Sequence, residues 1–275
     1  MSNTRLPTYF ISHGGGPWPW MEGDMRRRFD KLEESLLDMR RKLGDQPKSV
    51  LVVTGHWEVP GFAISSGARP GMVFDYFGFP EELYHISYPA PGSPELARRV
   101  QQLLAAGGME AELDPCRGFD HGTFSIMRPL YPQADIPVVQ LSINRNLDPK
   151  LHLEAGRLLA PLRDEGVLII GSGLSYHNLR EMRDERGIEP SRRFDAWLRD
   201  TLKALPQQRT EKLIEWEKAP LARAAHPRED HLIPLMVAVG ASENEPAATT
   251  YHQSDLMGGI TASSFRFGDL PTSQP

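Results

Sequence analysis

Apolar and polar positions along the chain follow two different periods. Several short, continuous apolar runs are rich in β-branched residues, as is typical of strands buried on both faces of a sheet. We expect such strands at 8–13, 49–57, 137–143 and 167–173. Longer stretches repeat their apolar residues at the i, i+3, i+4 spacing of helices with one buried face. We expect these helices at 26–44, 93–108, 148–166, 190–205, 209–218 and 230–241.

The order of these elements predicts the fold class. Short strand-like runs at 249–253 and 263–268 follow the last helix, and the final residues, from about 270 to 275, have a disordered-looking composition. Strands that alternate with helices indicate helices packed on both faces of a mainly parallel sheet. Because no repeat or change of composition divides the chain, we predict one α/β domain over 1–275. It would be an α/β/α sandwich around a mainly parallel, mixed central sheet.

Composition narrows the functional classes. The 275 residues are 40% hydrophobic and 24% charged, with a net charge of −5, and the run at 26–28 is interpreted as the solvated face of a helix. Nucleic-acid binding is therefore not expected. No stretch approaches the roughly 18 apolar residues of a membrane span, and the first residues contain no apolar signal segment. Cys116 is the single cysteine, which excludes a disulfide framework within the chain. We expect a cytoplasmic protein; the oligomeric state stays open.

Polar side chains follow the predicted strands at the end where α/β sheets bind ligands. His13 ends the first strand and His56 ends the second. The fourth strand runs on to His177, and Asn144 ends the third. A single histidine in such a place is more often a packed side chain with one hydrogen bond. Two at the tips of buried strands favour a functional site at the carboxyl ends of the sheet.

The segment "AAHPREDHLIPLMVAVG" contains two more histidines. His226 and His231 are five residues apart, so a continuous helix would separate them by about 140° and keep them from sharing a metal. Pro234 places the start of the regular helix near Asp230, with Asp230 as N-cap and His231 in the first turn. Either His231 or Glu229 has a side chain suited to a metal, whereas His226 is interpreted as structural.

Other motifs carry less information on their own. His121 lies in a "GFDHG" segment, where a turn histidine with a local hydrogen bond is as good an interpretation as a functional one. His85 and Tyr88 lie in a proline-rich loop that either walls a pocket or only connects two elements. The chain contains neither a G-x-S-x-G elbow nor a phosphate-binding P-loop, and the "GSG" at 171–173 is too short to indicate dinucleotide binding.

Six segments taken together resemble a known family. They are "YFISHGGGPW", "TGHWE", "YPAPGSPELA", "GFDHGTFSIM", "GSGLSYHNL" and "HPREDHLIPLMVAVGA". In this order they are similar to the signature segments of the DOPA-type class III extradiol ring-cleavage dioxygenases, relatives of the catalytic subunit of protocatechuate 4,5-dioxygenase. The resemblance extends from residue 9 to residue 241. It specifies a family more closely than it specifies a substrate.

The resemblance implies a metal centre. By it, His13 and His56 are metal ligands, and His231 in the "EDH" segment is the third. The protocatechuate relatives have a glutamate at the third place, so Glu229 stays open as an alternative. Imidazole suits zinc as well as iron. We therefore expect Fe(II) for activity, with Zn(II) as an alternative bound ion.

The resemblance also implies the roles of two further histidines. His177 in "SYHN" matches the acid/base histidine of the family, and it is also a candidate for the metal shell. His121 in "FDHG" matches a second pocket histidine that contacts a substrate oxygen. Histidines that bind metal are held neutral by hydrogen-bond partners behind them. Glu58 and Asp230 are the candidates for such partners, although a solvated charge is an equally good interpretation of Glu58.

Three functions stay open at this stage. The first is extradiol cleavage by a metal-dependent dioxygenase, with O₂ and a small catechol such as DOPA as substrates and a muconate semialdehyde as product. The second is a zinc-dependent hydrolase or amidase that uses a metal-bound water on the same residues. The third is a metal-binding protein without catalytic activity, because folds are reused without their chemistry.

Overall fold

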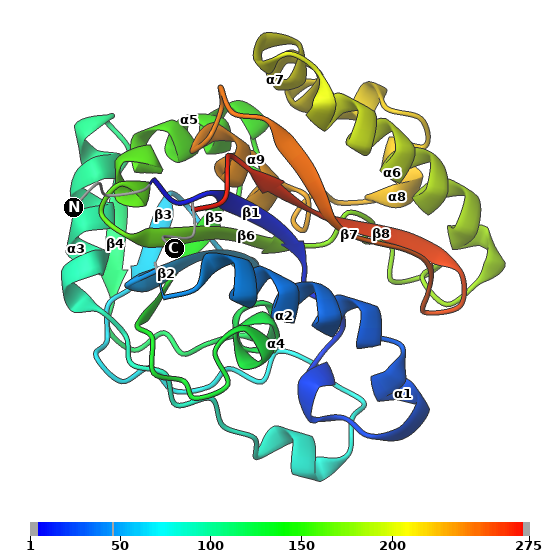
Figure 1. Ribbon diagram of the computed structural model, residues 1–275, viewed down its shortest axis with the longest axis horizontal. Helices are drawn as coiled ribbons and strands as arrows, with labels where there is room; N and C mark the ends of the chain where they lie inside the picture. Colours follow the sequence, from blue (N-terminus) through cyan, green and yellow to red (C-terminus); the bar gives the residue numbers. More distant parts are fainter. Residues whose placement is uncertain (1–4, 46, 272–275) are drawn as a thin grey trace.

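The fold is built on one twisted sheet. A computed structural model describes residues 5–45 and 47–271, and its strands form an eight-stranded sheet in the order β4-β3-β5-β2-β6-β1-β8-β7 (Figure 1). The strands are β1 (Thr8–Ser12), β2 (Ser49–Val59), β3 (Phe62–Ser65), β4 (Ala111–Asp114), β5 (Val138–Asn144), β6 (Val167–Gly173), β7 (Ala247–Leu256) and β8 (Ile260–Phe267).

The centre of the sheet is parallel and its edges are mixed. β1 and β2 both pair in parallel with β6, and β2 also pairs in parallel with β5. β8 is antiparallel to β1 and forms an antiparallel hairpin with β7, and β3 is antiparallel to β5. The four central strands are the four continuous apolar runs of the sequence, and their residues are almost all buried. The prediction of an α/β sandwich around a mixed, mainly parallel sheet is confirmed.

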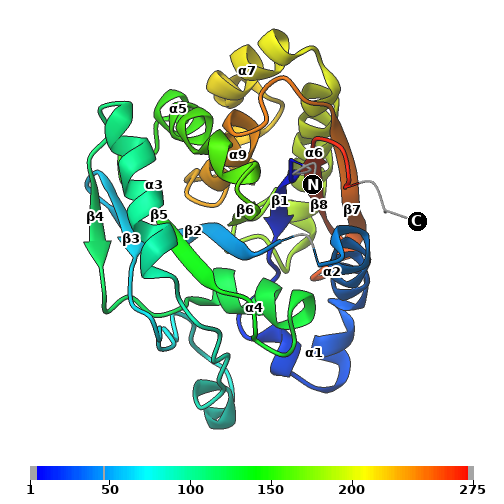
Figure 2. The ribbon, with the colours of Figure 1, turned by 60° about the vertical axis from the view of Figure 1, so that its left-hand side comes forward.

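Helices cover both faces of the sheet. In Figures 1 and 2, α3, α5, α9 and α6 lie over one face and α2 and α4 over the other. The longer helices are α2 (Asp30–Leu43), α3 (Pro94–Ala106), α4 (His121–Leu130), α5 (Pro149–Leu159), α6 (Ile188–Lys203), α7 (Pro206–Ile214) and α9 (Ile233–Gly240); the short ones are α1 (Gly23–Arg27) and α8 (Ala222–Ala225). Within the described part of the chain, no helix is long and apolar enough to cross a membrane.

Several boundaries differ from the prediction. The helix expected at 26–44 is two helices, because Phe29 turns into the core between α1 and α2 with 1% exposure. The helix expected at 148–166 ends at Leu159, and a turn of 3₁₀ helix follows over Ala160–Arg163. β3 and β4 were not predicted, since each has only four residues. Of the tail expected from about 270, residues 272–275 lie outside the described residues.

Two corrections concern segments with histidines. His121 is the first residue of α4 rather than part of an isolated turn, because the Asp120 carboxylate caps that helix by accepting the Thr123 backbone N–H. The last helix was expected to begin at Asp230, but α9 begins at Ile233. The proline at its second position fits the first turn of a helix, where no backbone N–H is needed. Asp230 and His231 therefore lie in the turn before α9.

Candidate active site

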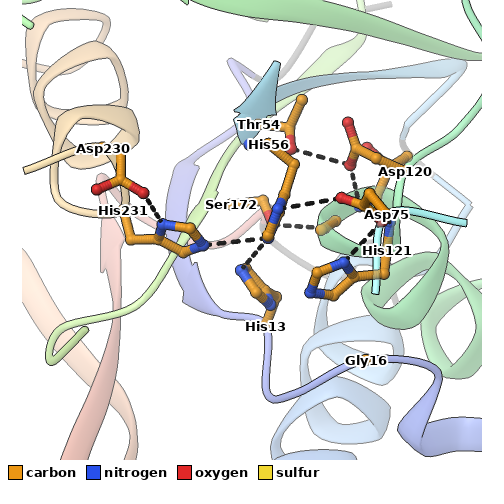
Figure 3. Close-up of polar contacts among 12 residues, drawn as sticks. His13, Gly16, Thr54, His56, Asp75, Asp120, His121, Ser172, Asp230 and His231 are labelled. Atoms are coloured by element: carbon orange, nitrogen blue, oxygen red, sulfur yellow. Dashed lines mark hydrogen bonds and ion pairs between the residues drawn. The ribbon is translucent and has the colours of Figure 1, made fainter. Parts of the chain in front are cut away.

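Three histidines converge at the carboxyl ends of the central strands. Nε2 of His56 lies 3.2 Å from Nε2 of His13 and 3.1 Å from Nε2 of His231 (Figure 3). His13 and His231 are 1% and 3% exposed, and the His56 side chain is 16% exposed. We call these three residues the histidine trio.

His13 is placed by the end of β1. Its backbone N–H donates to the Gly173 carbonyl at the end of β6, and its own carbonyl accepts the Trp18 indole N–H at 2.9 Å. The glycines after His13 lie against aromatic rings. A Cβ at Gly14 would lie 2.8 Å from the Trp18 ring, and one at Gly16 would lie 2.6 Å from the Phe79 ring. Glycine at these two positions therefore lets the Trp18 and Phe79 rings pack directly on the backbone.

His56 projects from an irregular stretch of β2. The pairing of β2 with β5 shifts register between Val53 and Glu58, and such irregularities re-aim side chains next to functional sites. The Thr54 hydroxyl accepts the His56 backbone N–H at 3.2 Å and donates to the buried Asp120 carboxylate at 2.9 Å. These hydrogen bonds therefore fasten β2 to the start of α4 at the point where the His56 side chain projects from the strand.

His231 reaches the site because the turn before α9 lies directly on β6. A Cβ at Gly173 would lie 2.0 Å from the His231 carbonyl oxygen, so only glycine permits this approach. The same carbonyl accepts the Leu174 backbone N–H at 3.0 Å. The "GSG" motif thus serves close packing of the chain rather than nucleotide binding.

Two aspartates stand behind the trio. Asp75 Oδ2 lies 3.1 Å from Nδ1 of His56, and Asp230 Oδ2 lies 2.5 Å from Nδ1 of His231. With the Nδ1 proton donated to a carboxylate, a neutral imidazole carries a lone pair on Nε2. Nδ1 of His13 is buried and has no hydrogen-bond partner among the described residues. Asp230 was expected behind a ligand; Asp75 was not.

Two more histidines flank the trio. Nδ1 of His121 lies 2.8 Å from Asp75 Oδ1, and the His121 ring centroid is 3.9 Å from that of His56. The His177 ring stacks on the His231 ring with centroids 3.5 Å apart, and its Nδ1 lies 3.6 Å from Asp230 Oδ2. All the predicted site histidines therefore gather in one place.

Burial controls the charge of the site. It lowers the pKa of His13 and of His231 well below the usual value, and neighbouring histidines lower both further. Burial also lowers the pKa of His177 to about 3. For His56, burial alone would lower the pKa, but the hydrogen bond to Asp75 and nearby carboxylates outweigh it and raise the pKa. The site thus combines neutral imidazoles with an anionic surrounding that favours a cation.

Several residues considered from the sequence are engaged elsewhere. The Glu229 carboxylate pairs with Arg223, so it is not turned toward the trio. The Glu58 carboxylate pairs with Arg228 and contacts no histidine of the trio, so of the two interpretations of Glu58 the structure favours a charge outside the site. Nε2 of His226 lies 3.1 Å from the Ser175 carbonyl oxygen, as expected of a structural histidine.

Two residues of the proline-rich loop, His85 and Tyr88, also have partners outside the trio. His85 is exposed beside Glu81, and the buried Tyr88 hydroxyl donates to the Tyr131 carbonyl. Asp75 is the functional candidate that sequence reasoning missed. It lies in the loop between β3 and α3, where no periodic pattern marks it, and only the long-range contacts reveal it.

The trio fits a metal ion. Two nitrogens, each about 2.1 Å from one ion, lie about 3.0 Å apart at a right angle and about 3.4 Å apart at the tetrahedral angle. The observed separations of 3.1 and 3.2 Å fall between these values. Neutral imidazoles with their Nδ1 protons on carboxylates are typical metal ligands. A further group of His13, His56 and His121 brings ligand atoms within 4.8 Å of one another, as does a group of His177, Asp230 and His231.

Fold and site together define a metal-binding α/β enzyme, and comparison with known proteins gives its family. Residues 7–267 match the family described as the catalytic LigB subunit of aromatic ring-opening dioxygenase. The chain belongs to this family and is an aromatic ring-opening dioxygenase, which confirms the resemblance noted in the sequence.

Relatives cover almost the whole chain. It is 40% identical over 265 residues to a protein of Beta vulgaris named 4,5-DOPA dioxygenase extradiol, covering 94% of this chain and 96% of the relative. Proteins of the same name from Portulaca grandiflora and Escherichia coli K12 are 38% and 32% identical, covering 96% and 98% of this chain and 96% and 97% of their own lengths. The crystal structure of an uncharacterised Escherichia coli K12 protein superposes with a TM-score of 0.78 at 29% identity, covering 96% of this chain and all of that one.

Proposed function

We propose that this protein is an Fe(II)-dependent extradiol dioxygenase that opens the ring of a DOPA-like catechol with O₂ to give a muconate semialdehyde. The observation that carries the proposal is the convergence of three Nε2 atoms, 3.1 and 3.2 Å apart, beside two further histidines. The names of the relatives, several of them 4,5-DOPA dioxygenase extradiol, support a catechol with an amino-acid side chain as the first substrate to test.

In this proposal His13, His56 and His231 hold the metal. When bound, the ion would supply Lewis acidity that lowers the pKa of the catechol hydroxyls, and redox activity toward O₂. The carboxylates of Asp75 and Asp230 keep the Nδ1 protons of His56 and His231 in place. They also balance part of the positive charge of the ion.

The flanking histidines move protons. His121 donates from Nδ1 to Asp75, so its Nε2 is free to accept a hydroxyl proton from the catechol. The carboxylate then stabilises the imidazolium that forms. Burial lowers the pKa of His177 to about 3, so its ring is neutral at pH 7 and has a lone pair for a proton released by the substrate. It would return that proton to the substrate when the ring opens. Our earlier assignment of His177 to the metal shell stays a prediction.

The test is anaerobic reconstitution of the metal-free protein with Fe(II), followed by DOPA and air. We expect stoichiometric O₂ uptake together with a new yellow absorbance, and neither with Zn(II) in place of Fe(II). His177→Ala should keep its metal and lose turnover, because the proton acceptor is removed from an intact trio. If neither DOPA nor a panel of other catechols caused O₂ uptake, the proposal of a dioxygenase would be refuted. Metal-dependent hydrolysis of ester or amide substrates would then identify the zinc hydrolase.

A further inference from the structure

One loop carboxylate contacts two histidines with different roles. Asp75 Oδ2 accepts from Nδ1 of His56 at 3.1 Å, whereas Asp75 Oδ1 accepts from Nδ1 of His121 at 2.8 Å (Figure 3). The backbone N–H of His121 also donates to Oδ1, at 3.1 Å. Figure 3 shows the carboxylate between the two rings. Its side chain is 19% exposed.

The chemistry of a carboxylate decides which ring nitrogens carry protons. Three nitrogens lie within hydrogen-bond distance of the Asp75 carboxylate, the backbone N–H of His121 and Nδ1 of each ring, and hydrogen bonds to the charged form of a carboxylate favour that form. An ionised carboxylate only accepts hydrogen bonds. Both rings must therefore present an N–H at Nδ1, which leaves the Nε2 of each neutral ring with a lone pair.

The loop that carries Asp75 is fastened to the segment before His121. The Val73 backbone N–H donates to the Phe119 carbonyl at 2.7 Å, and the Phe119 N–H donates to the Gly71 carbonyl at 2.8 Å. The Tyr76 ring meets the His121 ring edge-on at 5.9 Å. The carboxylate is thus held in register with His121 by backbone bonds.

We propose that Asp75 is a positioning residue that fixes the Nδ1–H tautomer of both His56 and His121, and so aims a metal-binding nitrogen and a proton-accepting nitrogen at the same place. The proposal rests on the proposed function for the roles of these two rings. Asp230 does not fix the tautomers of two rings in this way, because it is within hydrogen-bond distance of His231 but not of His177. It lies 2.5 Å from Nδ1 of His231 but 3.6 Å from Nδ1 of His177, beyond hydrogen-bond distance.

Asp75→Asn tests the proposal with almost no change of shape. An amide has an oxygen acceptor and an NH₂ donor, and the backbone N–H of His121 requires the oxygen on its own side. The NH₂ group then faces Nδ1 of His56 and forces the ring into the Nε2–H tautomer, which has no lone pair for the metal. We expect the Kd for Zn(II), measured by titration of the metal-free protein, to rise about 10- to 100-fold. kcat with Fe(II) should fall as well.

Asp195→Asn is the matched control. Asp195 on α6 is fully buried and, like Asp75, pairs with basic side chains, here that of Arg199, but it contacts no residue of the trio. This variant should bind Zn(II) with the wild-type Kd. Thermal unfolding of the metal-free proteins shows whether each variant is folded. A folded Asp75→Asn protein with an unchanged Kd would overturn the proposal.

A second measurement needs no variant. ¹⁵N NMR of the histidine rings in the metal-free wild-type protein reports which nitrogen carries the proton. We expect a proton on Nδ1 of both His121 and His56, with Nε2 of His56 accepting a hydrogen bond. A neutral ring of either residue that carries its proton on Nε2 and none on Nδ1 would refute the proposal. Neither the Zn(II) Kd nor the tautomers depend on the substrate. Failure of the catechol assay therefore leaves both readouts intact, and failure of this proposal leaves the assay intact.

Discussion

The buried ring of His152 makes the stability of the protein depend on pH through a group remote from the trio. His152 is 0% exposed on α5, and its Nε2 accepts the Asn144 backbone N–H at 3.0 Å. Its Nδ1 donates to the Asp148 carbonyl at 2.7 Å. Both ring nitrogens are thus used by the neutral form. A second proton, on Nε2, would remove the acceptor for Asn144 and charge a buried ring.

The sign and size of this change of stability with pH follow from the pKa of His152. Burial lowers the pKa of His152 from 6.5 to about 4. Between these values the unfolded chain binds a proton that the folded chain does not, so stability that is complete above pH 6.5 is lost as the pH falls toward 4. The pKa difference corresponds to about 3.4 kcal/mol in all, of which about 2 kcal/mol is lost between pH 7 and pH 5.

His152→Gln removes this dependence, because the glutamine side chain does not titrate. Urea unfolding of the metal-free proteins at pH 7 and pH 5 measures the change. Other histidines are present in both proteins and cancel in the comparison. We expect wild type to lose about 2 kcal/mol more than the variant over this interval. His85→Gln, at an exposed ring, should behave as wild type. Equal losses for wild type and His152→Gln would refute the reasoning.

Three further predictions concern the metal and the core. His13→Ala should abolish tight metal binding, and a full equivalent of metal retained after dialysis would show that the ligand set is wrong. Glu229→Gln should keep the wild-type metal content whereas His231→Gln should lose it, as measured by elemental analysis; the reverse result would make Glu229 the third ligand. Arg163→Met should destabilise the protein by about 1–3 kcal/mol in urea unfolding, since the Leu6 and Ala241 carbonyls lose the buried guanidinium that donates to them at 2.6 and 2.8 Å. An unchanged free energy of unfolding would show that these hydrogen bonds add nothing to stability.

The residues that the sequence predicted well are those marked by their own neighbours. His13 and His56 each close an apolar run that can only be a buried strand, and parallel strands end at the same edge of a sheet. The cap of α4 was also marked locally, since Asp120 stands three residues before Thr123, whose backbone N–H it accepts. We interpreted that segment as an isolated turn and so missed a helix start that the residue pattern contained.

Pairings between distant segments were not predictable in the same way. Glu58 was a reasonable partner for a neighbouring histidine, yet its carboxylate pairs with Arg228, 170 residues away in sequence. β3 and β4 are too short to show a period, and they are recognised only by their places beyond β5 in the sheet. Such contacts depend on which loops the fold brings together.

The order of the strands explains why His13 and His56 could be expected to meet, whereas the place of Asp75 could not be predicted. β6 lies between β1 and β2, so two strands from the first part of the chain are joined by one from the second (Figure 2). The histidines at the ends of these strands therefore lie close together, regardless of the loops that follow them. The loop carrying Asp75 is fastened to the same place by its backbone hydrogen bonds with Phe119. Because those bonds use main-chain atoms, no side-chain pattern reports them. The residue that sets the tautomers of two histidines is therefore visible only in three dimensions.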